Sequence, residues 1–104
     1  MLVVIFEVET KPGRSGDYFA LASALRAELE RIPGFVSVER FRHLTAPEKF
    51  VSISTWRDEA AVRAWREHAE HRAAQARGRD DIFADFRIRV TEVVRDYSMA
   101  DRTG

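Results

Sequence analysis

The order in which two hydrophobic periods follow one another constrains the fold of this chain more than any single motif. Apolar residues recur at every second position in four segments and at every third or fourth position in two others, in the order β-α-β-β-α-β. Short connections and right-handed crossovers fold this order into a ferredoxin-like α+β sandwich, an antiparallel sheet with both helices on one face. We expect strands over residues 2–9, 35–43, 49–56 and 83–97, and helices within residues 15–32 and 58–78.

Capping and turn residues mark the ends of both predicted helices. Ser15 or Asp17 can accept a backbone N–H at the start of the first helix, and the Pro-Gly pair at 33–34 stops it. Asp58 is placed to cap the second helix, which we expect to end at Gly78.

Length and composition limit the classes of protein to consider. The 104 residues suffice for one domain, which we place at residues 1–97, followed by a polar tail at 98–104. Seventeen Lys and Arg balance seventeen Asp and Glu, which argues against a general binder of nucleic acid or anionic membranes. The absence of cysteine excludes disulfides, thiolate nucleophiles and Cys-ligated metals.

The apolar start of the chain is read as a strand. Residues 1–7 lack a basic leading region and reach a carboxylate at Glu7, so they do not resemble a signal peptide. No later run is long enough to span a membrane, and we expect a cytoplasmic protein. The sequence also contains no Gly-rich phosphate loop, nucleophile elbow or zinc-protease motif.

One face of the predicted sheet needs a cover that the helices do not supply. The first strand is apolar on both sides, with Val4 and Phe6 on one face and Val3 and Ile5 on the other. Two helices can cover only one of these faces. We therefore expect a homodimer that packs sheet against sheet.

Histidines are the candidates for proton transfer near neutral pH. On the second helix, His68 falls about 60° and His71 about 120° from Trp65, so His68 lies at the flank of the buried stripe. His68 is then a candidate pocket wall, or else simply a partly covered histidine. The spacing of the two histidines suits a metal ion, but no third ligand is supplied nearby, so we predict no metal site.

The predicted hairpin gathers aromatic and polar side chains. If His43 pairs with Phe50, then Phe41 faces Ser52, and Trp56 lies on the same surface. An apolar surface with a few polar groups is typical of a small-molecule pocket. The alternative is that these rings only fill the core.

Four segments together resemble the antibiotic biosynthesis monooxygenase family over residues 2–97. The clearest is the strand–helix segment STWRDEAAVRAWREH at residues 54–68. The others are IPGF at 32–35, the remainder of the second helix through Gly78-Arg79, and the closing strand from Phe86 to Tyr97.

This resemblance implies a ferredoxin-like homodimer whose sheets form a barrel, and a choice of activities. Some members oxygenate aromatic substrates without a cofactor, others degrade haem, and a few isomerise small metabolites. Trp56 matches a pocket tryptophan of the cofactor-free oxygenases, Ser52 replaces their usual amide, and Phe41 replaces a pocket histidine for which His43 is the nearest substitute. The helix tryptophan of the haem degraders corresponds to Trp65, whereas their iron-ligating histidine is replaced by Gln75.

The leading hypothesis is a cofactor-independent monooxygenase that oxidises a quinol, phenol or anthrone with O₂. His68 or His43 would act as base, and the walls of the site would be Phe41, Ser52, Trp56 and Trp65. The alternatives are a non-catalytic module that binds a small hydrophobic molecule and a haem-binding or haem-degrading protein.

Overall fold

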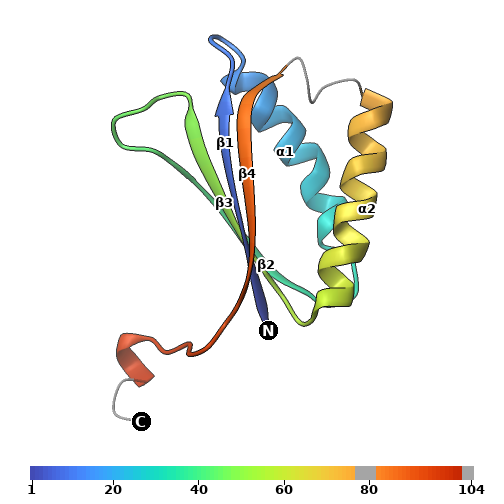
Figure 1. Ribbon diagram of the computed structural model, residues 1–104, viewed down its shortest axis with the longest axis vertical. Coiled ribbons are helices and arrows are strands. Elements are labelled where there is room, and N and C mark those ends of the chain that lie inside the picture. The colour runs from blue at the N-terminus through green and yellow to red at the C-terminus, as the bar shows by residue number, and fades with distance from the viewer. Residues whose placement is uncertain (77–81, 102–104) are drawn as a thin grey trace.

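Four strands and two helices follow one another in the predicted order. The computed structural model describes residues 1–76 and 82–101, with the backbone alone for residues 70–76. The elements are β1 (Leu2–Thr10), α1 (Ser15–Leu29), β2 (Phe35–Arg42), β3 (Lys49–Trp56), α2 (Glu59–Ala76), β4 (Phe83–Glu92) and a 3₁₀ turn (Met99–Asp101). The antiparallel sheet has the order β2-β3-β1-β4, and both helices lie on one side of it (Figure 1). The ferredoxin-like α+β sandwich is confirmed.

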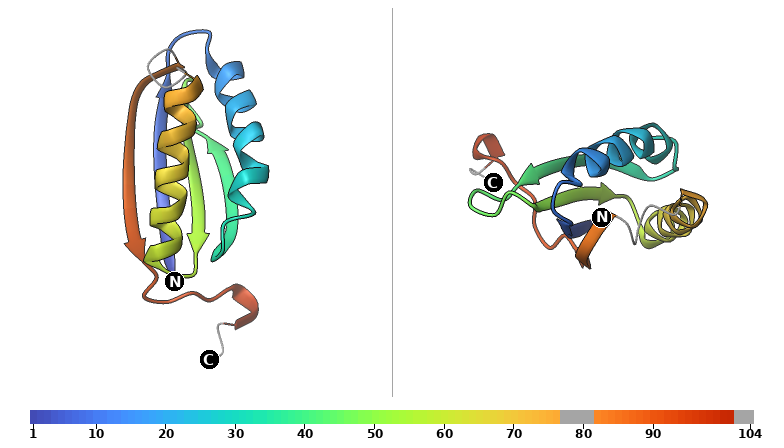
Figure 2. Two further views of the ribbon diagram at one scale, coloured as in Figure 1. Left: turned by 90° about the vertical axis from the view of Figure 1, so that its right-hand side faces the viewer. Right: turned by 90° about the horizontal axis from the view of Figure 1, so that it is seen from above.

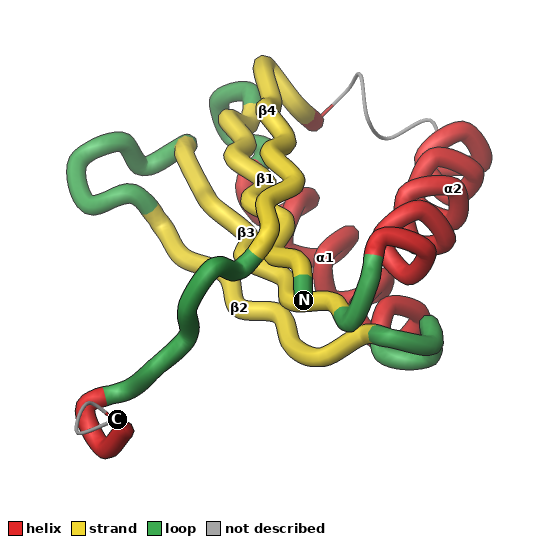
Figure 3. Tube along the Cα trace, turned by 60° about the horizontal axis from the view of Figure 1, so that its bottom comes forward, coloured by secondary structure: helices red, strands yellow, loops and turns green. Residues whose placement is uncertain are grey.

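The last strand is shorter than the predicted 83–97. β4 ends at Glu92 because its partner β1 begins at Leu2, and the last backbone bond runs from the N–H of Val93 to the carbonyl of Met1 at 3.0 Å. The following residues leave the sheet as an extended segment (Figure 3). It ends in the 3₁₀ turn, which is closed by a 2.9 Å hydrogen bond from the Ser98 hydroxyl to Asp101.

One of the two predicted helix caps is present. The N–H of Ala61 donates to Asp58 Oδ1 at 2.9 Å, and this bond, with a second from Arg57, lowers the pKa of Asp58. Neither Ser15 nor Asp17 caps α1, so that prediction is wrong. The Ser15 hydroxyl instead bonds to Glu48, and Asp17 pairs with an arginine. Gly78, the predicted end of α2, lies outside the described residues.

The predicted register of the hairpin is wrong by one residue. Arg42, not His43, pairs with Phe50, and Phe41 is therefore opposite Val51 on the other sheet face from Ser52. The cause is local: the Nδ1 atom of His43 accepts the backbone N–H groups of residues 45 and 46 at 3.1 and 3.0 Å. This contact tightens the turn, and the N–H of His43 then bonds to the carbonyl of residue 49.

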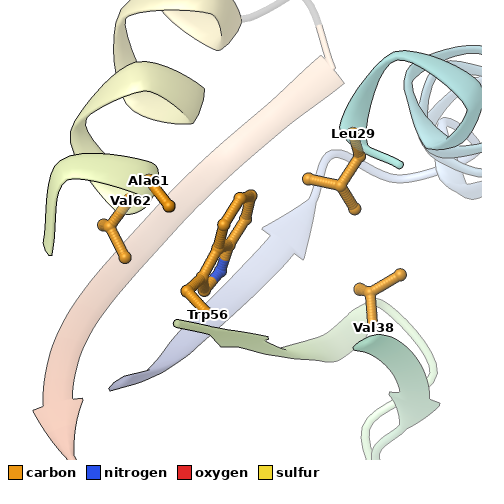
Figure 4. Close-up of a cluster of buried hydrophobic side chains, with 5 residues drawn as sticks. All are labelled: Leu29, Val38, Trp56, Ala61 and Val62. Carbon is orange, nitrogen blue, oxygen red and sulfur yellow. The ribbon is translucent and has the colours of Figure 1, made fainter. Parts of the chain in front are cut away.

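The core between sheet and helices consists of two clusters. The first joins the end of α1 to the start of α2 around Trp56, which is 0% exposed; its buried members are Leu29, Val38, Trp56, Ala61 and Val62 (Figure 4). The second lies near the start of α1 and contains Val8, Tyr18, Phe50 and Ile82. Figure 2 shows α1 beside β2, with α2 in front of the middle strands.

The sheet face that carries no helix is apolar at its centre, as expected. Val3 and Ile5 of β1 lie beside Val51 and Ile53 of β3, and Ile53 is 37% exposed. An ion pair of 2.9 Å between Glu7 and Arg89 borders this patch. We call Val3, Ile5, Val51 and Ile53 the outer patch. No helix in the described residues is long and apolar enough to cross a membrane.

Candidate functional site

Two stacked tryptophans connect the end of β3 to α2. The rings of Trp56 and Trp65 lie 6.3 Å apart, centroid to centroid, with 24° between their planes. The indole N–H of Trp56 donates to the hydroxyl of Ser54 at 2.9 Å, inside the core. Because a buried indole N–H needs an acceptor, this bond fixes the orientation of Trp56 and hence of the stack.

His68 extends the stack by one ring and faces a carboxylate from the other helix. Its imidazole lies 5.8 Å from the ring of Trp65, and its Nε2 atom lies 3.4 Å from Oε2 of Glu28 on α1. Both of these atoms are shielded from solvent. A carboxylate at Nε2 favours the tautomer with hydrogen on Nε2, which leaves the lone pair on Nδ1. Nδ1 is then the atom of His68 that could accept a proton from a substrate.

The neighbouring part of the sheet is apolar and only partly covered. Val90 and Ile88 of β4 pair with Val4 and Phe6 of β1, on the face toward the helices. Yet Ile88 is 52% and Val90 53% exposed. Since Val4 and Trp65 both pack against the first core cluster, this apolar strip continues from the tryptophan pair. The helix-facing side of β4 is therefore open to an apolar molecule.

The structure separates the predicted site residues into two groups. Trp56, Trp65 and His68 lie together as described above. Ser52 is on the same sheet face, opposite Phe6 and Arg40, but it is Ser54 that bonds to the indole.

The second group lies at the other end of β3. Phe41 is on β2, and its 47% exposed side chain comes from the opposite sheet face. His43 is exposed in the hairpin loop beside Lys49, where its Nδ1 is occupied by the turn. Lys49 begins β3 and Trp56 ends it, a length of about 23 Å. His43 and His68 therefore belong to different regions of one chain.

Glu28 and Ser54 are functional candidates that sequence reasoning missed. Ser54 and Trp56 are two residues apart on a strand, so the sequence predicts that they share a sheet face. It does not predict the hydrogen bond between their side chains. Glu28 precedes the core residue Leu29, and its position opposite His68 depends on how the two helices are rotated. The rotation of the two helices about their axes cannot be predicted from the spacing of residues in the sequence.

Metal ligands do not cluster in the described part of the chain. No group of three His, Cys, Asp or Glu side chains there could hold a metal ion. The side chains of His71 and Gln75, which bear on the metal and haem hypotheses, lie outside the described residues.

Comparison with known proteins identifies the family. Residues 1–77 match the family model for antibiotic biosynthesis monooxygenase. Among curated proteins, the chain is 40% identical over 93 residues to a jasmonate monooxygenase from Pyricularia oryzae. That match covers 89% of this chain but 43% of the relative, so the chain spans less than half of that protein.

Solved structures of low sequence identity share the fold. A putative antibiotic biosynthesis monooxygenase from Nitrosomonas europaea gives a TM-score of 0.78 at 17% identity, covering 91% of this chain and all of the other. A mutant of MhuD with two manganese protoporphyrin IX molecules bound per active site gives 0.76 at 19% identity, covering 94% and 99%. A Pseudomonas aeruginosa protein, PA3566, gives 0.76 at 21% identity, covering 90% and 94%. With the family model matching most of its length, the chain belongs to the antibiotic biosynthesis monooxygenase family.

Proposed function

We propose that this protein is a monooxygenase that uses O₂ on a small apolar substrate with a removable proton, and that His68 removes that proton. The observation that carries the proposal is the position of the His68 imidazole. It lies between the Trp65 ring and the Glu28 carboxylate, where α2 faces α1. A base held beside an aromatic ring could remove a proton from an apolar substrate bound against that ring.

The reaction needs little more from the protein than this. Proton transfer to Nδ1 of His68 leaves a carbanion or phenolate, which gives one electron to O₂. The resulting substrate radical and superoxide combine into a peroxide anion, which takes a proton back and loses water. Overall, a CH₂ group and O₂ become a carbonyl group and water, so the atoms and electrons balance. Trp65 and Ser52 would orient the substrate, and the buried Trp56 would hold Trp65 in place.

The substrate class follows from the same chemistry. Hydroquinones, phenols and anthrones give stabilised anions that O₂ can oxidise, and they match the aromatic walls. The name of the Pyricularia oryzae relative adds a second type, a cyclic ketone with a carboxylate, which can form an enolate. Both types are mainly apolar, which suits the apolar strip formed by Ile88 and Val90.

Oxygen uptake by the purified protein tests the proposal. The panel contains anthrones, hydroquinones and jasmonate, in chelator and without added cofactor. His68→Gln should lower the turnover of an accepted substrate by about 10²–10⁴-fold. His43→Asn keeps a turn acceptor near the Nδ1 position and serves as the matched control, with turnover within a few-fold of the unchanged protein. Equal turnover in all three proteins would remove His68 as the base, whereas ligand binding without uptake would favour a non-catalytic binding module.

Haem is a second candidate ligand, favoured by the open apolar strip and by the fold likeness to the porphyrin-bound MhuD mutant. Of the two histidines whose side chains are described, His68 is the one that lies with the tryptophan pair, so it would be the group to meet the porphyrin iron. A haem titration decides this. A Soret shift that saturates, and that His68→Ala abolishes, would support haem binding. A Soret absorbance that changes without saturating would reject it.

We also propose that two copies associate through the outer patch. Four adjacent aliphatic side chains at the centre of a sheet, without a covering helix, favour association. Ile53→Glu places a charge in this patch and should yield a monomer in sedimentation velocity. Ala27→Glu, on an exposed position of α1, should leave the dimer intact. If both variants were monomers, or both were dimers, the outer patch would not be the interface.

A further inference from the structure

A hollow in the surface lies away from His68, between the start of α1 and the edge strand β2. Its volume is about 300 Å³, and its lining residues are Tyr18, Phe19, Arg40, Phe41, Arg42 and Phe50. Tyr18 stands near the first turn of α1 and Glu28 near its last, which separates the hollow from the catalytic candidates by about 15 Å along the helix. The hollow is therefore a distinct place on the molecule.

Aromatic rings form one wall of the hollow. Phe19 meets Phe50 edge to face, with centroids 5.0 Å apart and 81° between the ring planes. Tyr18 lies 5.4 Å from Phe50 behind them and is buried. Phe19 nevertheless remains 42% exposed. The wall is thus a fixed apolar surface that a second flat group could cover.

Two guanidinium groups lie beside this wall. The Cζ atom of Arg42 is 5.9 Å from the ring centroid of Phe50. Arg40 lies near the phenol of Tyr18, whose pKa is raised by burial and lowered by the Arg40 guanidinium. The ion pairs formed by arginines within the described residues use Arg14, Arg26, Arg57 and Arg89. In that part of the chain, Arg40 and Arg42 therefore have no carboxylate partner, and both retain N–H groups for an external acceptor.

We propose that this hollow binds a small aromatic carboxylate. The planar guanidinium groups of Arg40 and Arg42 match the geometry of a carboxylate, and the half-exposed ring of Phe19, supported by the buried Phe50, matches a flat apolar body. The volume is at the lower end for ligand pockets and suits a molecule of one or two rings. The site does not depend on the proposed oxygenase chemistry, because it shares no residue with the group around His68.

A titration followed by ¹H–¹⁵N correlation spectra tests the proposal, with 2-naphthoate as probe and 2-naphthamide as its uncharged match. We expect saturable shifts for 2-naphthoate at the backbone amides of Phe19, Phe41 and Phe50. The amide probe should bind at least about tenfold more weakly, because it lacks the charge-assisted hydrogen bonds.

Variants identify the groups that hold the carboxylate. Arg40→Gln with Arg42→Gln should weaken 2-naphthoate by about 10–100-fold. Arg31→Gln, an exposed arginine after α1, is the control and should bind normally. The same spectra show whether each variant is folded.

Three results would overturn the proposal: no saturable shift, equal affinity in the double variant, or shifts confined to residues around Trp65 and His68. The last result would place the carboxylate in the candidate active site instead. Loss of oxygenase activity in His68→Gln has no bearing on this titration, so the two proposals can fail separately.

Discussion

Gly34 lies so close to Ala61 that a Cβ atom on Gly34 would be 2.7 Å from the Cβ of Ala61. This contact joins the start of β2 to the first turn of α2. Gly34 also has φ of +95°, and its carbonyl accepts the N–H of Arg57 at 2.7 Å. The position of α2, and with it that of Trp65 and His68, depends on this close approach.

Gly34→Ala should therefore destabilise the protein by about 2–4 kcal/mol, because it combines a left-handed backbone with a steric clash. Gly13→Ala separates the two causes: φ is +77° there, but no atom lies within 4 Å of the added Cβ, so the cost should be about 1 kcal/mol. Gly16→Ala, in helical backbone with open space around it, should stabilise α1 by about 0.5–1 kcal/mol. Urea unfolding curves measure all three, and an equal loss for Gly34 and Gly13 would contradict the clash.

The stack of Trp56 on Trp65 gives an optical prediction. Two indoles this close and nearly parallel couple their excited states, so the far-ultraviolet circular dichroism should contain an exciton couplet. Trp56→Phe and Trp65→Phe should each abolish the couplet. Trp56→Phe should also cost stability, since it leaves a gap in the core and removes the donor to Ser54. A couplet that survives either substitution would show that the stack is absent in solution.

The fold could be predicted because its signals are local and repeated. Periods of two and of three to four residues, the Pro-Gly stop before Phe35 and the cap at Asp58 all favour the same β-α-β-β-α-β order. The register of the hairpin could not be predicted, since one side chain, that of His43, sets the length of the turn.

The candidate site was predictable only in part. The tryptophans share a strand–helix unit with His68, so sequence spacing places these three together. Glu28 comes from a different helix, and the separation of Phe41 from Ser52 follows from a register that spacing leaves open. Tertiary packing decides both.

A polar junction at Glu48 should contribute measurably to stability. Its carboxylate accepts the hydroxyl of Thr10 at 2.7 Å and that of Ser15 at 3.0 Å, which ties the β2–β3 loop to the start of α1. Thr10 is 1% exposed, and without this carboxylate its hydroxyl keeps only the longer contacts to the Ser15 hydroxyl at 3.1 Å and the Glu48 carbonyl at 3.4 Å. Glu48→Ala should lower the free energy of unfolding by about 1–3 kcal/mol. Glu30→Ala, at an exposed pair with Arg26, should change it by less than about 0.5 kcal/mol, and equal effects would contradict the junction.

Tyr18 should make stability fall at alkaline pH. Burial raises the pKa of Tyr18 above its usual value of 10.0, while the charge and hydrogen bond of Arg40 act in the opposite direction. The folded state therefore keeps this proton longer than the unfolded state, so its contribution is complete below pH 10 and is lost as the pH rises above that value. Tyr18→Phe should remove this part of the pH dependence.

The chain contains two tyrosines, so Tyr97→Phe leaves Tyr18 as the sole phenol for an ultraviolet titration. In that background, Arg40→Gln should move the titration to still higher pH, because it removes the two effects that lower the pKa of Tyr18. A titration midpoint that stays the same, or moves down, would show that the Arg40 guanidinium does not contact Tyr18 in solution.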